Sequence, residues 1–155
     1  MKEMSVIVRV TAALMTAPIL IFGMYQMMHG HLTPGGGFPG GAIAATAVAM
    51  LLVAYGGDRF KTALKKDTLA MLESIGLLGF ILLALHFGPK VTLFKNIMAN
   101  TGGLFGTQIA YGINPGNLNT AGHIPLMELA VGLEVFAALS IIIYLMYTAG
   151  GANET

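Results

Sequence analysis

Four long apolar segments constrain the fold of this chain more than any other feature. They cover residues 5–28, 38–55, 68–87 and 124–147, and each is close to the roughly 20 residues that a helix needs to span a bilayer. Backbone groups in lipid must form their hydrogen bonds within the segment, and the alternating pattern of a membrane β-barrel is absent. The sequence therefore predicts an all-α integral membrane protein with four transmembrane helices, built as a single domain over residues 1–155.

The composition agrees with a lipid environment. Charged residues make up 10% of the chain, whereas a soluble domain carries about 25%. There is no cysteine, which excludes disulfides, thiol catalysis and iron–sulfur ligation by this chain. The net charge of +1 gives no footprint for nucleic acid. The first apolar segment is too long for a signal peptide core, and no clear cleavage site follows it. We expect no metal site and no cofactor within this chain.

The basic residues predict how the chain is oriented in the cell membrane. Four spans place both termini and the connection 56–67 on one side. That side carries six lysines and arginines and the other side two: Lys2, Arg9, Arg59, Lys61, Lys65 and Lys66 against Lys90 and Lys95. Lysine and arginine accumulate in cytoplasmic loops, so both termini of this multi-pass protein are predicted to be cytoplasmic. The connection 56–67 is interpreted either as a short interfacial helix or as an ordinary charged loop.

A glycine-rich loop joins the first two segments and is the densest motif in the chain. It runs from His29 to Gly41 as HGHLTPGGGFPGG. Glycine tolerates positive φ and close backbone approach, while proline stiffens a turn and suits the first turn of a helix. The residues assigned to this turn are Pro34, Gly35, Gly36, Gly37, Gly40 and Gly41. The G-x-G-x-x-G pattern within it follows a membrane segment rather than a strand, so a nucleotide site is not predicted.

Small residues continue beyond this loop into the second segment. Gly41, Ala45 and Ala49 recur every fourth residue, a stripe that lets helices approach closely in lipid. The sequence predicts a sharp reversal with two tightly packed antiparallel helices. His29 and His31 flank the turn, and each either bonds the loop backbone or takes part in proton or cation uptake. His86, at the same end of the third segment, is a further uptake candidate or only a hydrated cap.

Three carboxylates within the apolar segments are the candidates for ion translocation: Glu134, Glu73 and Glu128. Glu134 lies about 15 Å into the fourth segment, near the centre of a hydrocarbon core about 30 Å thick, where a charge costs about 2.5–3.5 kcal/mol. Its helical neighbours include Ala130, Ala137 and Ala138, a face suited to tight packing. A carboxyl group that titrates there serves a proton relay, and one that stays protonated is a structural acid.

The other two carboxylates lie elsewhere along the spans. Glu128 precedes Glu134 by six residues, so it points about 120° away around the helix and the two share no site without a bend. It lies nearer the outer boundary, where hydration is a sufficient explanation. Glu73 is interpreted either as a partner of Lys65 or Lys66 or as part of a polar path.

The glycine loop, with its PGGGF core and following glycine pair, resembles the MnhB (also MrpB) subunit of multisubunit monovalent cation/proton antiporters. Arg9 at the start of the first helix, Glu73 with Gly76 in the third, and the G-L-E-V run of residues 132–135 agree. The resemblance implies assembly with other antiporter-type subunits and Na⁺ and H⁺ as transported ions. Related subunits occur in membrane-bound hydrogenases and ferredoxin-linked respiratory complexes, so hydrogenase-like iron–sulfur subunits are further possible partners. It also implies that Glu134 and Glu73 match membrane carboxylates of the family.

The sequence is therefore interpreted as a non-catalytic subunit that supports sodium/proton exchange. The first alternative is the same subunit in a redox-driven, sodium-translocating respiratory complex. The second is a structural scaffold that holds neighbouring ion-conducting subunits in register. A stand-alone transporter ranks lower because no inverted repeat is visible, and a membrane enzyme ranks last for want of a catalytic motif.

Overall fold

The computed structural model describes residues 3–57, 65–86, 92–109 and 113–152 of the chain. Within these residues it has four long helices: α1 (Val6–Met28), α2 (Gly37–Tyr55), α4 (Lys66–Ala84) and α5 (Ile124–Ala152). All four are long and apolar enough to cross a membrane. The predicted all-α class and the four spans are confirmed. Residues 58–64, which carry the predicted interfacial helix, lie outside the described part of the chain.

Two predicted C-terminal helix ends differ from those in the structure. The third helix was expected to reach residue 87, but it ends at Ala84 because the backbone of Leu85 becomes extended. Leu85–His86 forms strand β1, which pairs antiparallel with Thr92–Leu93, strand β2. The backbone N–H of Phe94 donates to the carbonyl of Ala84 at 2.7 Å. The last helix continues past residue 147 to Ala152.

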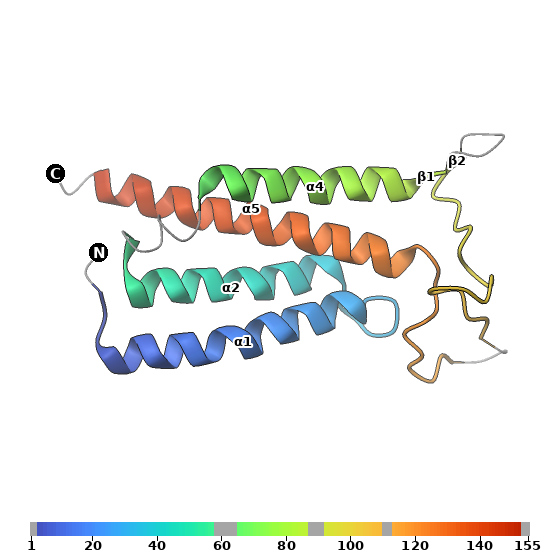
Figure 1. Cartoon of the computed structure of the whole chain (residues 1–155), viewed down its shortest axis with the longest axis horizontal. Helices are drawn as coiled ribbons and strands as arrows, with labels where there is room; N and C mark the ends of the chain where they lie inside the picture. The colour runs from blue at the N-terminus through green and yellow to red at the C-terminus, as the bar shows by residue number, and fades with distance from the viewer. Residues whose placement is uncertain (1–2, 58–64, 87–91, 110–112, 153–155) are drawn as a thin grey trace.

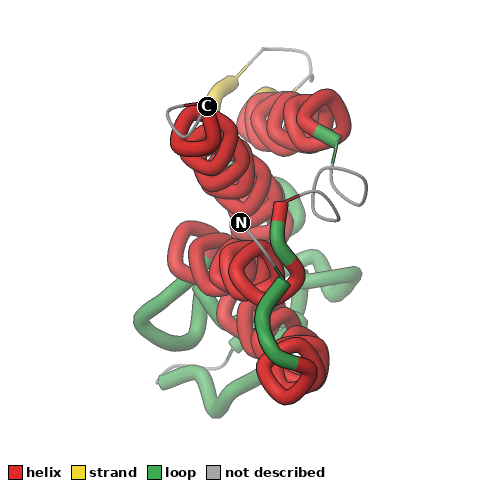
Figure 2. The backbone as a smooth tube through the Cα atoms, turned by 90° about the vertical axis from the view of Figure 1, so that its left-hand side faces the viewer, coloured by secondary structure: helices red, strands yellow, loops and turns green. Residues whose placement is uncertain are grey.

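The helices lie in a row in the order α1, α2, α5 and α4 (Figure 1). The end-on view shows the same elongated arrangement, in which α5 separates α2 from α4 (Figure 2). Half of the residues in the most apolar stretch of α2 are buried, compared with 11% in α1 and 17% in α4. The outer helices of the row therefore present most of their apolar surface outward.

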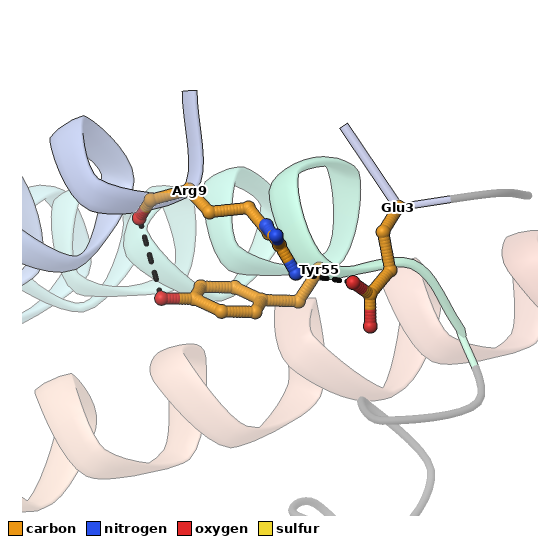
Figure 3. A network of polar contacts seen from close by, with 3 residues as sticks. All are labelled: Glu3, Arg9 and Tyr55. Carbon is orange, nitrogen blue, oxygen red and sulfur yellow. Dashed lines mark hydrogen bonds and ion pairs between the residues drawn. The ribbon is translucent and has the colours of Figure 1, made fainter. Parts of the chain in front are cut away.

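Both termini lie at one end of the row, and the glycine turn lies at the other with the long connection after α4 (Figure 1). At the end with the termini, Ser5 is the N-cap residue of α1, and its hydroxyl oxygen accepts from the N–H of Val8. The Tyr55 hydroxyl at the end of α2 donates to the carbonyl of Arg9 at 3.3 Å, and the Arg9 guanidinium pairs with Glu3 (Figure 3). These contacts fasten the start of α1 to the end of α2.

Small residues set the spacing between the helices. A Cβ added to Gly23 of α1 would lie 2.8 Å from the carbonyl oxygen of Gly40 and 3.3 Å from the Cβ of Ala44. A Cβ added to Gly41 would lie 2.5 Å from the carbonyl oxygen of Gly132 in α5. The predicted close packing of α1 on α2 is confirmed, but it uses Gly40 and Ala44, whereas Gly41 of the predicted stripe contacts α5.

The long connection folds without a long helix in its described residues, 92–109 and 113–123. In this connection, asparagine side chains accept hydrogen bonds from backbone N–H groups that have no backbone carbonyl as a partner among the described residues. Asn119 accepts from the N–H of Phe105 at 2.5 Å, and Asn114 accepts from the N–H groups of Gly116 and Asn117. Such bonds satisfy a backbone that forms neither helix nor ladder.

Candidate functional site

Glu128 closes the glycine turn. It lies in the first turns of α5, and its Oε2 accepts a hydrogen bond from the backbone N–H of Gly37, the first residue of α2. The N-cap residue of α2 is Gly36, at a φ of 112°, and its lack of a side chain leaves the first N–H groups without a local cap. A carboxylate is favoured at a helix N-terminus, where the helix dipole is positive. Glu128 therefore caps α2 from another helix.

The turn is closely fitted around this carboxyl group. A Cβ added to Gly30 would lie 2.9 Å from the Glu128 Cδ and 2.6 Å from the Cα of Gly36. Glycine is thus required at Gly30 by close approach and at Gly36 by its positive φ. The sequence analysis predicted the turn but missed its partner, because Glu128 and Gly37 are 91 residues apart.

The two histidines of the turn have different surroundings. The His29 ring stacks on Tyr25 with 3.9 Å between ring centroids, and its Nδ1 lies 3.0 Å from the Tyr25 carbonyl oxygen. The His29 ring therefore contacts the backbone of α1 rather than that of the loop. The structure assigns His86 to β1, and its side chain lies outside the described part of the chain.

His31 holds its ring in a buried position. Both ring nitrogens are buried and have no hydrogen-bond partner among the described residues. Burial lowers the pKa of His31 below its ordinary value, and nearby His29 lowers it further, while Glu128 and the backbone of Asn117 act in the opposite direction. Burial disfavours the charged imidazolium, so the neutral form of His31 is favoured more than in a free histidine.

Glu134 lies on the opposite side of α5 from the glycine turn, at its contact with α4. A Cβ added to Gly76 of α4 would lie 2.7 Å from the backbone nitrogen of Glu134 and 2.8 Å from the carbonyl oxygen of Ala130. The two helices touch there almost backbone to backbone. Ala137, one turn further along α5, is fully buried. The small-residue face predicted around Glu134 is the face that packs on α4.

Glu73 belongs to the same helix contact. It precedes Gly76 by three residues, about 4.5 Å along the helix, and is partly buried with Leu72 on the side of α4 that carries buried Leu69 and Gly76. Glu73 forms no ion pair with Lys65 or Lys66, since the ion pair recorded within the described residues is Arg9 with Glu3. Lys66 begins the helix two turns before Glu73, about 10 Å away along the axis.

The structure thus divides the three predicted carboxylates into two groups. Glu73 and Glu134 flank the Gly76 contact, which we call the α4–α5 seam, whereas Glu128 faces α2. The prediction that Glu128 and Glu134 share no site is confirmed. Neither Glu73 nor Glu134 has a hydrogen bond or ion pair with any other described residue, and both are partly exposed. Among the described residues, no three histidine, aspartate or glutamate side chains lie close enough to hold a metal ion.

The glycine turn, the seam and most of α5 fall within one family match. Residues 7–141 match the family described as a domain related to the MnhB subunit of Na⁺/H⁺ antiporter. The chain belongs to this family. The match includes Glu73, Glu128 and Glu134, so both groups of carboxylates lie in the part that carries the family relationship.

Individual relatives agree with the family. An uncharacterized protein of Methanocaldococcus jannaschii is 33% identical over 146 residues, which is 93% of this chain and 53% of that protein. The antiporter subunit mnhB2 of Staphylococcus saprophyticus is 31% identical over 52% of this chain and 57% of its own length. In Staphylococcus aureus strain Newman, mnhB2 is 36% identical over 43% of this chain and 48% of its own length. The chain spans about half the length of the curated relatives it matches.

Proposed function

We propose that this chain is a non-catalytic membrane subunit of a multisubunit Na⁺/H⁺ antiporter-type complex, in which it supports cation/proton translocation. The family relationship supports the subunit assignment. The observation that carries a role in translocation is the α4–α5 seam, where Glu73 and Glu134 lie within about one helical turn of the Gly76 contact and lack partners in the described chain. Ionisable groups at this depth mark ion and proton pathways in membrane proteins.

In the proposed mechanism the seam carboxylates carry protons on a path shared with neighbouring subunits. Glu134 lies ten residues from the start of α5, so water reaches it only through a path lined by protein. Glu73, at the same contact, offers a second carboxylate closer to the end that holds the termini. Both termini are proposed to be cytoplasmic, which places Glu73 on the cytoplasmic side of Glu134. A proton would pass between the two carboxylates, in either direction, as the complex exchanges cations.

The test is Glu134→Gln in the intact complex, reconstituted in vesicles. Sodium-dependent proton movement per assembled complex should fall by about a hundredfold, the lower end of what a positioned proton-transferring group contributes. The matched control is Ser74→Ala, which removes an exposed polar group that bonds only the carbonyl of Ala70 in its own helix. Unchanged transport by an assembled Glu134→Gln complex would exclude this role.

A scaffold role is the second candidate, and one observation favours it: the backbone of α2 lies directly against α5 at Gly41. If the chain acts only by holding its neighbours in register, Gly41→Leu should abolish transport by preventing assembly. In that case Glu134→Gln should leave transport per assembled complex unaffected. Measuring assembly and transport for both variants decides between the two candidates.

A further inference from the structure

We propose that the α4–α5 seam is a docking surface for a transmembrane helix of a neighbouring subunit, and that this helix carries a basic side chain at the depth of Glu73 and Glu134. The inference names a partner for the seam and rests on the proposal that the chain is part of a multisubunit complex. It concerns which group covers these carboxylates, and it does not require that they carry ions.

The first step is the position of the two carboxylates in the row. The seam lies between α5 and α4, the helix at the end of the row (Figure 1). Glu73 and Glu134 are partly exposed along it. Lipid against these carboxylates would leave polar groups without partners in hydrocarbon, which costs several kcal/mol per group. A protein surface therefore covers them.

The second step is that no basic residue in the described part of the chain forms an ion pair with either seam carboxylate. The basic residues within or beginning the four helices are Arg9 and Lys66. Arg9 lies on α1, at the far side of the row, and is paired with Glu3. Lys66 lies about 10 Å along α4 from Glu73 and forms no ion pair with it. Since no described basic residue neutralises the seam, the proposal assigns the complementary charge to a neighbouring chain.

The third step is the spacing of the carboxylates. Glu73 and Glu134 approach the Gly76 contact from opposite helices, with about one turn between them along the axis. One cationic side chain inserted at this level would reach either carboxylate. Removing one acid then leaves the cation a partner, whereas removing both leaves a buried charge unpaired, which is strongly unfavourable. Either carboxylate alone should therefore be sufficient for assembly with the partner helix.

The experiment tests whether assembly depends on the negative charge of residues 73 and 134 or on the shape of their side chains. The complex is purified from native membranes through a tag on this chain, and the other subunits are quantified relative to it. Glu73→Gln and Glu134→Gln alone should each retain assembly within about twofold, and the double glutamine variant should lose it by about a hundredfold. The double aspartate variant, which keeps the charge but not the shape, should assemble. A double glutamine variant that assembles like the wild type would overturn the proposal.

A second measurement separates assembly from folding. The seam acids have no partner among the described residues, so the double glutamine variant of the isolated chain should unfold in detergent at the wild-type temperature. A large decrease would mean that the acids stabilise the chain itself and would overturn the proposal. The outcome for transport is separate: Glu134→Gln complexes that assemble and transport normally would refute the ion path and leave the docking surface standing.

Discussion

At the scale of single residues, the chain treats its membrane carboxylates in two ways. Glu128 accepts a hydrogen bond from the backbone N–H of Gly37 at the N-terminus of α2, so it has a partner within the chain. Glu73 and Glu134 have no hydrogen bond or ion pair with any other described residue. The types of residue alone do not reveal this difference, because all three are glutamates in apolar segments.

Replacement of Glu128 should destabilise the isolated chain. Glu128→Ala removes the acceptor and the charge at the start of α2, and we expect it to lower the free energy of unfolding by about 1–3 kcal/mol. Glu128→Gln keeps an acceptor without the charge and should have a smaller effect. Thermal unfolding in detergent measures both, with Ser74→Ala as the control. A Glu128→Ala variant as stable as the wild type would mean that the cap is not needed.

His31 should make the stability of the chain depend on pH. Its pKa in the folded chain is lowered from 6.5, so the unfolded chain binds more protons as the pH falls below that value, and stability decreases. The contribution of His31 is fully present above pH 6.5. Unfolding temperatures should therefore decrease more between pH of about 8 and about 5 in the wild type than in His31→Gln. Equal decreases would show that His31 titrates like a free histidine.

At the scale of elements, glycine decides which helix faces can touch. Gly76 and Gly79 are both inside α4, but an added Cβ would meet backbone atoms at 2.7–2.8 Å from Gly76 and only the Ala130 Cβ at 3.7 Å from Gly79. The same substitution to alanine therefore has opposite consequences at positions one turn apart.

Gly76→Ala and Gly79→Ala form a matched pair. Alanine raises helix propensity equally at both, by about 0.8–1.0 kcal/mol. At Gly79 this gain should appear as neutral or increased stability. At Gly76 the forced separation of α4 from α5 should outweigh it, because overpacking costs about 1–3 kcal/mol. Thermal unfolding of the two variants side by side measures the difference. Equal stability would contradict the close approach at Gly76.

The helices and the glycine turn were largely predictable from the sequence. Which helices pack against one another was not. Segment length and apolarity were enough to predict four helices, and the run 34–41 was enough to predict the turn. The end of the third helix was missed because Leu85 and His86 continue an apolar run and leave the helix only to pair with β2. The place of α5 between α2 and α4 depends on matching surfaces such as Gly41 on Gly132, which lie far apart in the sequence.

At the scale of the whole molecule, an open row of four helices cannot bury its own apolar surface. Ile7 and Ile21 of α1 and Leu78 and Leu82 of α4 are all more than half exposed. In water such a surface would aggregate, whereas lipid and neighbouring helices cover it without cost. The shape therefore suits a subunit placed between other membrane chains.

The orientation of the row can be tested directly, because the chain has no cysteine of its own. Gln108 and Lys65 are exposed and lie in the connections at opposite ends of the row. If both termini are cytoplasmic, a membrane-impermeant thiol reagent added to intact cells should label Gln108→Cys and not Lys65→Cys. Permeabilised cells should show labelling at both. The reverse pattern in intact cells would invert the proposed topology.

The order of the row also bears on how the chain is made. The ribosome delivers α1 and α2 first, and this pair can associate through Gly23 and Gly40 as soon as both are inserted. The third membrane helix, α4, packs mainly on α5 among the described long helices, and α5 is synthesised last, after a connection of nearly forty residues. Until then Glu73 is in the bilayer without the surface it packs against. Biogenesis of this chain therefore includes an interval in which α4 depends on the insertion machinery or on a subunit already present.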